Sequence, residues 1–415
     1  MTAPVRIPFP VVDEVSRHCL QEEEPETVHI EVHLPGPVDQ MRLRKAFTEA
    51  LHRHPRILMR EARGPWYRRR YEWELTPEPD VEVVTFAPPG PRALQDARTR
   101  ALTEAPPLSV SPPIRLEVVD SVLFLTINHT ALDGPACLRV LATAAELYGG
   151  RDNAPAAPPV RPAEPRQDPP DTPTTWSPPA RVAPGTPDPS PGNGMLVTEL
   201  PLPHRPKGSP YTVNDQLMVT TALTIAHWNR EHGARPRPLR ITMPVDDRPR
   251  DTTMPIGNGT RLVEVPFAPA ELDHPDMSAL LRRTAERTRA LKALPRPQLG
   301  HGAALLTAPW APVAARAALT RTLRRAAAPW TSTTLLSNIG RIPYPLDFGE
   351  EAGRAHAVWF SAPARMPRGL TVTTASTAGR LHLALRWSRA LLSHGDGAHL
   401  RDLFEHYLHT TEVTP

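Results

Sequence analysis

One seven-residue segment, Asn-His-Thr-Ala-Leu-Asp-Gly at positions 128–134, fixes the order strand, turn, helix in the first third of the chain. Residues 122–127 form a β-branched and aromatic run that predicts a strand, and residues 135–147 have the apolar spacing of a helix. His129 is therefore expected at the end of a strand. An imidazole there, with an ordinary pKa of about 6.5, can accept a proton near neutral pH.

The spacing of this segment resembles the His-His-x-x-x-Asp-Gly signature of condensation domains and chloramphenicol-acetyltransferase-like acyltransferases. The resemblance implies that His129 is the catalytic residue, and Asn128 stands where the family has its first histidine. Because an amide cannot act as a base, His129 is the only base of the segment. We expect Asn128 to make a hydrogen bond at the strand end; the alternative is a role facing an oxyanion.

Further matches to the same family occur in family order along nearly the whole chain. They resemble an Arg-His-Pro helix exit, the strand before the histidine motif, a Thr-Val-Asn-Asp helix start, a Pro-Val-Asp-Asp-Arg strand with a Gly-Asn loop, a Ser-Asn-x-Gly-Arg element and an Asp-Phe-Gly element. They lie at residues 52–55, 112–116, 212–218, 244–250 with 257–259, 337–341 and 346–349. Such an ordered set is hard to explain by chance, and none of its members identifies a substrate.

The resemblance implies an α/β (α+β) fold in which two chloramphenicol-acetyltransferase-like lobes form a V-shaped pseudo-dimer, with an active-site tunnel at the seam. A chain of 415 residues suits two packed units. Residues 153–193 are rich in proline and lack apolar periodicity, which predicts an extended linker. We therefore place an N-terminal lobe with the histidine motif at 1–152 and a C-terminal lobe at 194–415, with a seam-bridging segment at 337–349.

Apolar periodicity predicts the main elements outside the histidine motif. Helices are expected at residues 38–54, 213–229, 277–292, 302–327 and 398–408, and strands at 195–200 and 239–245, with a hairpin formed by 370–375 and 381–387 around Ala378-Gly379.

The resemblance also implies a structural role for Asp133, which is expected to point away from the site and to pair with an arginine. Arg248 is the best match for that arginine, and Arg341 is the second. Loss of one member of a partly buried pair leaves a charge without compensation. Asp133→Ala should therefore lower stability at least as clearly as activity.

Several polar residues are candidates for the seam or the tunnel. Backbone amides near Gly134, or the side chains of Asn128 or Asn338, could stabilise an oxyanion. Asn214 and Asp215 most simply cap a helix. Asn258 is expected either to shape a loop at the seam or to be a turn residue with positive φ. The remaining tunnel or seam candidates are Ser337, Gly340, Arg341 and Asp347, and Trp330, Trp359 and Trp387 could line the tunnel but are more simply core aromatics.

Composition narrows the classes of partner. The two cysteines, Cys19 and Cys137, give neither a disulfide framework nor a metal-ligand spacing, so we expect no metal site and a reducing cytoplasm. No signal peptide, membrane span, phosphate loop or nucleic-acid-binding motif is recognisable. Arginines at 321–325, with Arg282 and Arg283, could contact a phosphopantetheine phosphate or an acidic carrier protein, although a solvated helix face is the simpler interpretation.

The leading functional hypothesis is a free-standing acyltransferase, cytoplasmic and monomeric, that acts in nonribosomal-peptide or polyketide biosynthesis. It would move an acyl group from the phosphopantetheine thioester of a carrier protein or coenzyme A to an amine or alcohol, without a bound cofactor. A second hypothesis is a non-catalytic condensation-like recruitment domain. A third is an enzyme that uses the tunnel for a non-acyl reaction, such as cyclisation of a tethered intermediate.

Overall fold

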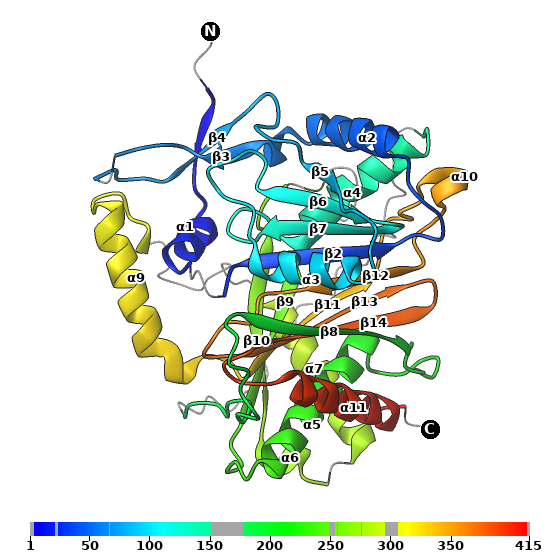
Figure 1. The fold of residues 1–415 in the computed structure, drawn as a ribbon. Helices are drawn as coiled ribbons and strands as arrows, with labels where there is room; N and C mark the ends of the chain where they lie inside the picture. The colour runs from blue at the N-terminus through cyan, green and yellow to red at the C-terminus, as the bar shows by residue number, and fades with distance from the viewer. Residues whose placement is uncertain are drawn as a thin grey trace.

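The computed structural model describes residues 4–20, 24–65, 67–151, 177–248, 254, 256–274, 276–294 and 306–412. Two large sheets and their helices form two lobes that lie against each other, and a small third sheet extends from the first lobe (Figure 1). This arrangement is the mixed α/β, two-lobed architecture that the sequence predicts.

The first lobe is built on a five-stranded sheet of order β12-β2-β7-β6-β5. Its neighbours are antiparallel except β5 and β6, which are parallel. Helices α2 and α4 bury one face of this sheet, and α3 covers the other. The bounds are β2 Thr27–His33, β5 Val84–Phe86, β6 Ile114–Val119, β7 Val122–Asn128, β12 Ala357–Ser361, α2 Gln40–Arg53, α3 Ala93–Thr103 and α4 Gly134–Tyr148.

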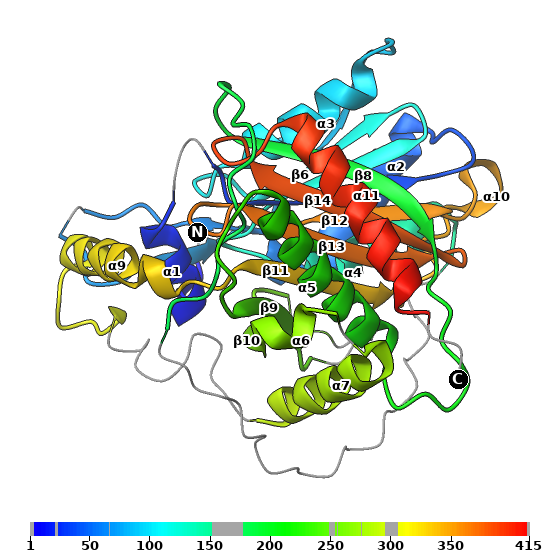
Figure 2. The same cartoon turned by 90° about the horizontal axis from the view of Figure 1, so that it is seen from below.

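A small sheet of order β1-β4-β3 and helix α1 lie at one end of the first lobe. Helix α9 packs beside α1, although the two are far apart in the sequence (Figures 1 and 2). The bounds are β1 Arg6–Pro8, α1 Val11–His18, η1 Pro55–Ile57, β3 Met59–Glu61, β4 Glu72–Leu75, α9 Val313–Ala327 and η2 Ala328–Trp330.

The second lobe is built on a six-stranded sheet of order β10-β9-β11-β13-β14-β8. Helices α5 and α11 pack side by side across one face, and α7 packs against α5 (Figure 2). The bounds are β8 Asn193–Pro201, α5 Val213–Glu231, β9 Leu239–Asp246, β10 Thr260–Phe267, α6 Pro269–Leu272, α7 Met277–Ala293, β11 Thr334–Arg341, α10 Gly349–Ala352, β13 Leu370–Thr377, β14 Arg380–Ser388 and α11 His394–Thr410.

The chain crosses between the lobes after β11. Residues 337–341 of the predicted seam-bridging segment belong to β11, whereas Ile342, Tyr344, Leu346 and Phe348 are buried in the core of the first lobe. The chain then adds β12 to the first sheet as an edge strand, with Ser361 paired to His29. A strand from the second half of the sequence thus completes the sheet of the first lobe.

The two lobes repeat one local structure. In the first, β7 ends at Asn128, whose carbonyl accepts from Ala131 and Leu132, and Asp133 caps α4. In the second, β14 ends at Ser388, whose carbonyl accepts from Leu391 and Leu392, and Ser393 caps α11. This shared strand, turn and capped helix is the internal repeat expected of a pseudo-dimer. Arg389 takes the place of His129 in the second copy, so only one copy carries the base.

Most predicted elements are present with ends shifted by a few residues, and the hairpin turns at Ala378 and Gly379, both with positive φ. The helix predicted at 302–327 is not continuous, because residues 307–312 are not helical. Residues 302–305 lie outside the described chain, and α9 begins only at Val313, after Pro312. Proline lacks an N–H and disfavours helix in the residue before it.

The predicted linker, residues 153–193, is described from residue 177 onward. Residues 177–192 form no helix or strand, but Ala180, Val182 and Ala183 are buried in the core of the second lobe. This part of the segment therefore packs as a fixed piece of the lobe, and the earlier part, 153–176, lies outside the described residues.

Candidate active site at the lobe interface

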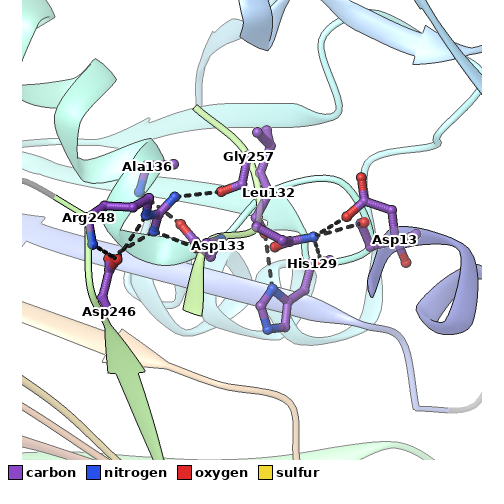
Figure 3. A network of polar contacts seen from close by, with 11 residues as sticks. Asp13, His129, Leu132, Asp133, Ala136, Asp246, Arg248 and Gly257 are labelled. Carbon is purple, nitrogen blue, oxygen red and sulfur yellow. Dashed lines mark hydrogen bonds and ion pairs between the residues drawn. The ribbon is translucent and has the colours of Figure 1, made fainter. Parts of the chain in front are cut away.

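His129 follows the last residue of β7, and one of its ring nitrogens is held by the turn itself. Its Nδ1 lies 3.0 Å from the carbonyl oxygen of Leu132. Because a carbonyl only accepts, this contact places the proton on Nδ1 and leaves the lone pair on Nε2. Among the described residues, no protein atom hydrogen-bonds to Nε2, and His129 lines a cavity between the lobes (Figure 3).

The backbone around His129 is held from both lobes. The N–H of His129 donates to the carbonyl of Glu26 at 2.8 Å. From the second lobe, Nδ2 of Asn258 donates to the carbonyls of His129 (3.2 Å) and Thr130 (3.0 Å) and to Oδ1 of Asp13 (2.9 Å). Positive φ in this loop belongs to Gly257 at 139°, not to Asn258. Asn258 therefore shapes the seam by tying the loop to the histidine turn.

Asp133 lines the cavity, but its two carboxylate oxygens are engaged by three separate groups. Its Oδ1 accepts from the N–H of Ala136 at 3.0 Å, which caps α4. Its Oδ2 accepts from Nη2 of Arg248 at 2.7 Å and from the N–H of Gly259 at 2.8 Å. The predicted ion pair between Asp133 and Arg248 is thus confirmed, and a helix cap that the sequence analysis did not assign to Asp133 accompanies it (Figure 3).

Arg248 is shared between two carboxylates. It also bonds to Asp246, at 2.9 Å and 2.8 Å, and to the carbonyl of Gly257 at 2.9 Å. Burial alone would lower the pKa of Arg248, but the hydrogen bonds and charges of Asp246 and Asp133 raise it above its ordinary value. Arg341, the second candidate partner, lies exposed at the end of β11. The pair therefore fixes the loop of the second lobe to the start of α4.

Asp13, on α1, is a buried carboxylate that the sequence analysis missed. Its Oδ1 accepts from Asn258 and its Oδ2 accepts from Nε1 of Trp73 at 2.9 Å. Burial raises the pKa of Asp13 to about 6, although both hydrogen bonds favour the charged form. Only the tertiary structure brings α1 to the histidine turn, so no local motif could have identified it.

The side chain of Asn128 forms hydrogen bonds only with backbone groups of described residues. Its Nδ2 donates to the carbonyl of Pro106 at 2.9 Å, and its Oδ1 accepts from the N–H of Thr130 at 3.1 Å. The residue is 4% exposed and does not line the cavity. These contacts match the expected strand-end hydrogen bond, and they leave Asn128 unsuited to donate to an oxyanion.

The cavity has a volume of about 670 Å³ and takes its walls from both lobes. Most of its lining is apolar, with His129, Ser337 and Asn338 among the polar exceptions. The walls come from α1, the start of α4, the β9–β10 loop, α9, β11 and the loop between β12 and β13. Gly134 lies at the start of α4, where an added Cβ would come 3.4 Å from Phe360.

The amide of Asn338 is engaged within the second lobe. Its Nδ2 donates to Oδ1 of Asn214 at 3.2 Å, and its Oδ1 accepts from Gly340 and Thr374. Gly340 has φ of 74° at a bulge in β11. Of the two residues expected to cap α5, Asp215 does so, since its carboxylate accepts from the N–H of Thr212 in a capping box. Asn214 does not cap the helix, because the N-cap residue is Thr212.

Asp347 and the three candidate tryptophans do not line the cavity. Asp347 pairs with Arg151 at 2.9 Å and accepts from the N–H of Gly349. Trp359 and Trp387 are buried core residues, as expected, and Trp330 is 46% exposed. Of the arginines singled out from the sequence, Arg324 lines the cavity, whereas Arg282 and Arg283 are on α7, well separated from α9 (Figure 2).

Metal and membrane signatures are absent from the described part of the chain. It holds no group of three or more His, Cys, Asp or Glu side chains that could bind a metal ion. None of its helices is long and apolar enough to cross a membrane. Cys137 is buried in α4, where burial raises the pKa of its thiol.

Comparison with known proteins finds relatives in sequence and in fold, although no protein-family model matches the chain. The uncharacterised protein Rv2305 of Mycobacterium tuberculosis is 28% identical over 389 residues, covering 82% of this chain and 84% of that protein. The condensation domain of the monacolin K polyketide synthase MokA superposes with a TM-score of 0.65 at 12% identity, covering 99% of this chain and 98% of that one.

The TRI3 trichothecene 15-O-acetyltransferase of Fusarium sporotrichioides superposes with a TM-score of 0.64 at 12% identity. It covers 99% of this chain and 96% of that one. Both likenesses extend over the two lobes rather than over one of them. The chain therefore has a condensation-like acyltransferase fold, which it shares with the MokA condensation domain and the TRI3 acetyltransferase.

Proposed function

We propose that this protein transfers an acyl group from a phosphopantetheine thioester, on a carrier protein or coenzyme A, to an amine or alcohol. The observation that carries the proposal is the state of His129. Its Nδ1 proton is fixed by the carbonyl of Leu132, and its Nε2 has no partner among the described residues in an apolar cavity. A base with one nitrogen fixed and the other available is what this reaction needs.

In the proposed reaction Nε2 of His129 accepts the proton of the acceptor as its nitrogen or oxygen attacks the thioester carbonyl. The tetrahedral intermediate then collapses, the carbon–sulfur bond breaks, and the imidazolium returns the proton to the departing thiolate. The products are an amide or ester and a free thiol. The cavity holds both reactants together and keeps out water, the competing nucleophile.

The oxyanion of the intermediate needs donors in the same cavity. The amides of Asn128 and Asn338 are already engaged. Ser337 lines the cavity and makes no side-chain hydrogen bond to a described residue, and Gly134 lies in the first turn of α4, where helix N–H groups have no partner within the helix. We assign the oxyanion site to this region between β11 and α4.

One chain supplies both sides of the cavity, so the proposed enzyme acts as a monomer. The donor would be the thioester of a carrier protein or coenzyme A, without a further cofactor, and the product an amide or ester of a specialised metabolite. The donor and the product are proposed from the resemblance of the sequence to condensation domains and related acyltransferases. The fold neighbours that support them are a polyketide-synthase condensation domain and an acetyltransferase.

Thiol release from a panel of acyl thioesters, on coenzyme A and on carrier protein with pooled amines and alcohols, tests the proposal. In His129→Ala we expect acceptor-dependent release to fall by about 10² to 10⁴ because the general base is lost. His274→Ala is the matched control, since the His274 side chain is 99% exposed. Equal release by wild type and His129→Ala would contradict acyl transfer by this base and favour a recruitment domain or a non-acyl reaction.

A further inference from the structure

Three arginine side chains lie on one wall of the cavity. Arg324 comes from α9, and Arg365 and Arg368 come from the loop between β12 and β13. The apolar side chains of Leu323, also on α9, and Met366 line the same wall. The wall is therefore cationic within a mainly apolar cavity, and the proposed reaction at His129 does not use these charges.

Only one of these three arginines, Arg365, forms an ion pair with a described carboxylate. Arg365 pairs with Oε1 of Glu26 at 2.5 Å and donates to the carbonyl of Cys19. Arg368 donates only to the hydroxyls of Ser332 (2.9 Å) and Thr242 (3.4 Å), with no described carboxylate within ion-pair distance. Arg324 makes no hydrogen bond or ion pair with a described residue.

Two neighbouring arginines, one buried and one partly buried, add to the positive charge. Arg386, which is 1% exposed, donates to the carbonyl of Thr27 at 2.7 Å, and Arg181 donates to the carbonyl of Pro367 at 3.1 Å. The nearby acids are Glu24, Glu26 and Glu264. Glu24 accepts from the N–H of Met366, and Glu264 pairs with Arg240 at 3.3 Å. Burial lowers the pKa of Arg368 to about 10, so the guanidinium remains charged near neutral pH.

The cationic wall lies close to the proposed base. The carbonyl of Glu26 accepts from the N–H of His129 at 2.8 Å, while the Glu26 carboxylate binds Arg365. A single residue thus connects the strand end that carries the base with the loop that carries Arg365 and Arg368. A molecule reacting at His129 can therefore reach this wall from within the same cavity.

We propose that Arg324 and Arg368 form a subsite for a compact anionic group, a carboxylate or a phosphate, on a molecule that binds in the cavity. Arg324 and Arg368 are partly buried, and no described carboxylate lies within ion-pair distance of either. An incoming oxyanion would supply that charge and accept paired hydrogen bonds. The apolar lining implies that the anion is joined to an apolar segment. The inference rests on the proposed function, because it names the substrate class of that same site.

Binding, rather than turnover, tests the subsite. Calorimetry would compare decanoate with decanamide, which differ in charge, and coenzyme A with pantetheine, which lacks phosphate. We expect wild type to prefer one charged member at least tenfold, which corresponds to about 1.4 kcal/mol. Arg368→Gln and Arg324→Gln should each reduce that preference, and Arg368→Lys should retain part of it.

Arg321→Gln is the matched control, because Arg321 is exposed on the same helix and does not line the cavity. Thermal melting confirms that each variant is folded. If Arg368→Gln does not fold, Arg324→Gln alone tests the subsite. A preference for decanoate supports an anion on the acyl chain or acceptor. A preference for coenzyme A alone supports the subsite with the donor phosphate as its ligand.

No charge preference in wild type, or a preference that survives in both Arg324→Gln and Arg368→Gln, would overturn the subsite. The binding measurements are repeated in His129→Ala, where the preference should persist. Failure of acyl transfer with an intact charge preference would therefore count against the proposed function alone.

Discussion

Asp13 is the residue whose environment most clearly opposes its usual charge. Its folded-state pKa of about 6 exceeds the ordinary value of 3.8 because the carboxyl is buried. The folded protein therefore binds this proton more tightly than the unfolded chain does. The stability that this group contributes is fully present below the unfolded pKa and is lost as the pH rises through about 6, a change of about 3 kcal/mol.

We predict that Asp13→Asn removes this pH dependence. Between about pH 4 and about pH 7, the free energy of unfolding of wild type should fall relative to that of the variant by about 2 to 3 kcal/mol. Urea unfolding at a series of pH values measures the difference, in which the titration of all other groups cancels. Asp273→Asn, at a side chain 72% exposed, should show no such trend. A flat difference for Asp13→Asn would mean that its carboxyl titrates normally.

At this scale the sequence predicts residues that carry a local pattern and misses those that act through distant contacts. His129 and the pair of Asp133 with Arg248 were predictable because each belongs to a motif. Asp13 and Arg368 stand in stretches without a chemical signature. Their roles depend on contacts across 245 residues, as between Asp13 and Asn258, and 126 residues, as between Arg368 and Thr242.

Helix α4 is the element on which the site most depends, because its first turn carries the cap, the ion pair and Gly134. We predict that Asp133→Ala lowers the free energy of unfolding by about 3 to 5 kcal/mol, since Arg248 and the amide of Ala136 lose a common partner. Asp133→Asn should cost less, because a carboxamide oxygen can still accept from Ala136. Chemical denaturation of the three proteins measures both effects.

The activity of the same variants distinguishes a structural role of Asp133 from a catalytic one. An Asp133→Ala protein that unfolds like wild type but is inactive in thiol release would contradict the structural role and place Asp133 in the reaction. Elements with strong periodicity, such as the 370–388 hairpin, were predictable because apolar residues alternate along each strand and pack into the core of the second lobe. The start of α9 was not, because prolines at 309 and 312 interrupt an otherwise helical composition.

At the scale of the whole molecule, the two lobes are joined by a strand that crosses between them and by polar contacts of arginine side chains. Strand β12 belongs to the second half of the chain but pairs with β2 in the first sheet. Arg386 of β14 donates to Thr27 of β2, and Arg316 of α9 pairs with Glu14 of α1 at 2.8 Å. The sequence could predict two lobes from length and resemblance. It could not show that a strand crosses between them, because β12 has the same apolar pattern as any buried strand.

Because β12 completes a sheet that is otherwise built from the first half of the chain, we predict that the two lobes unfold as one unit. Val358 is fully buried in the first core, opposite Val32 of β2. Val358→Ala should cost about 2 kcal/mol through lost packing. Hydrogen exchange should show the same loss of protection in β7 of the first lobe and β14 of the second.

Leu319→Ala is the control for this prediction, since Leu319 is 49% exposed on α9 and should change stability by no more than about 0.5 kcal/mol. If Val358→Ala weakens protection in β7 while β14 keeps its wild-type protection, the lobes are separate cooperative units. In that case the crossing strand would hold the cavity walls in position without coupling their stability. The position of His129 relative to the second lobe would then depend on the local contacts of Asn258 and Arg248.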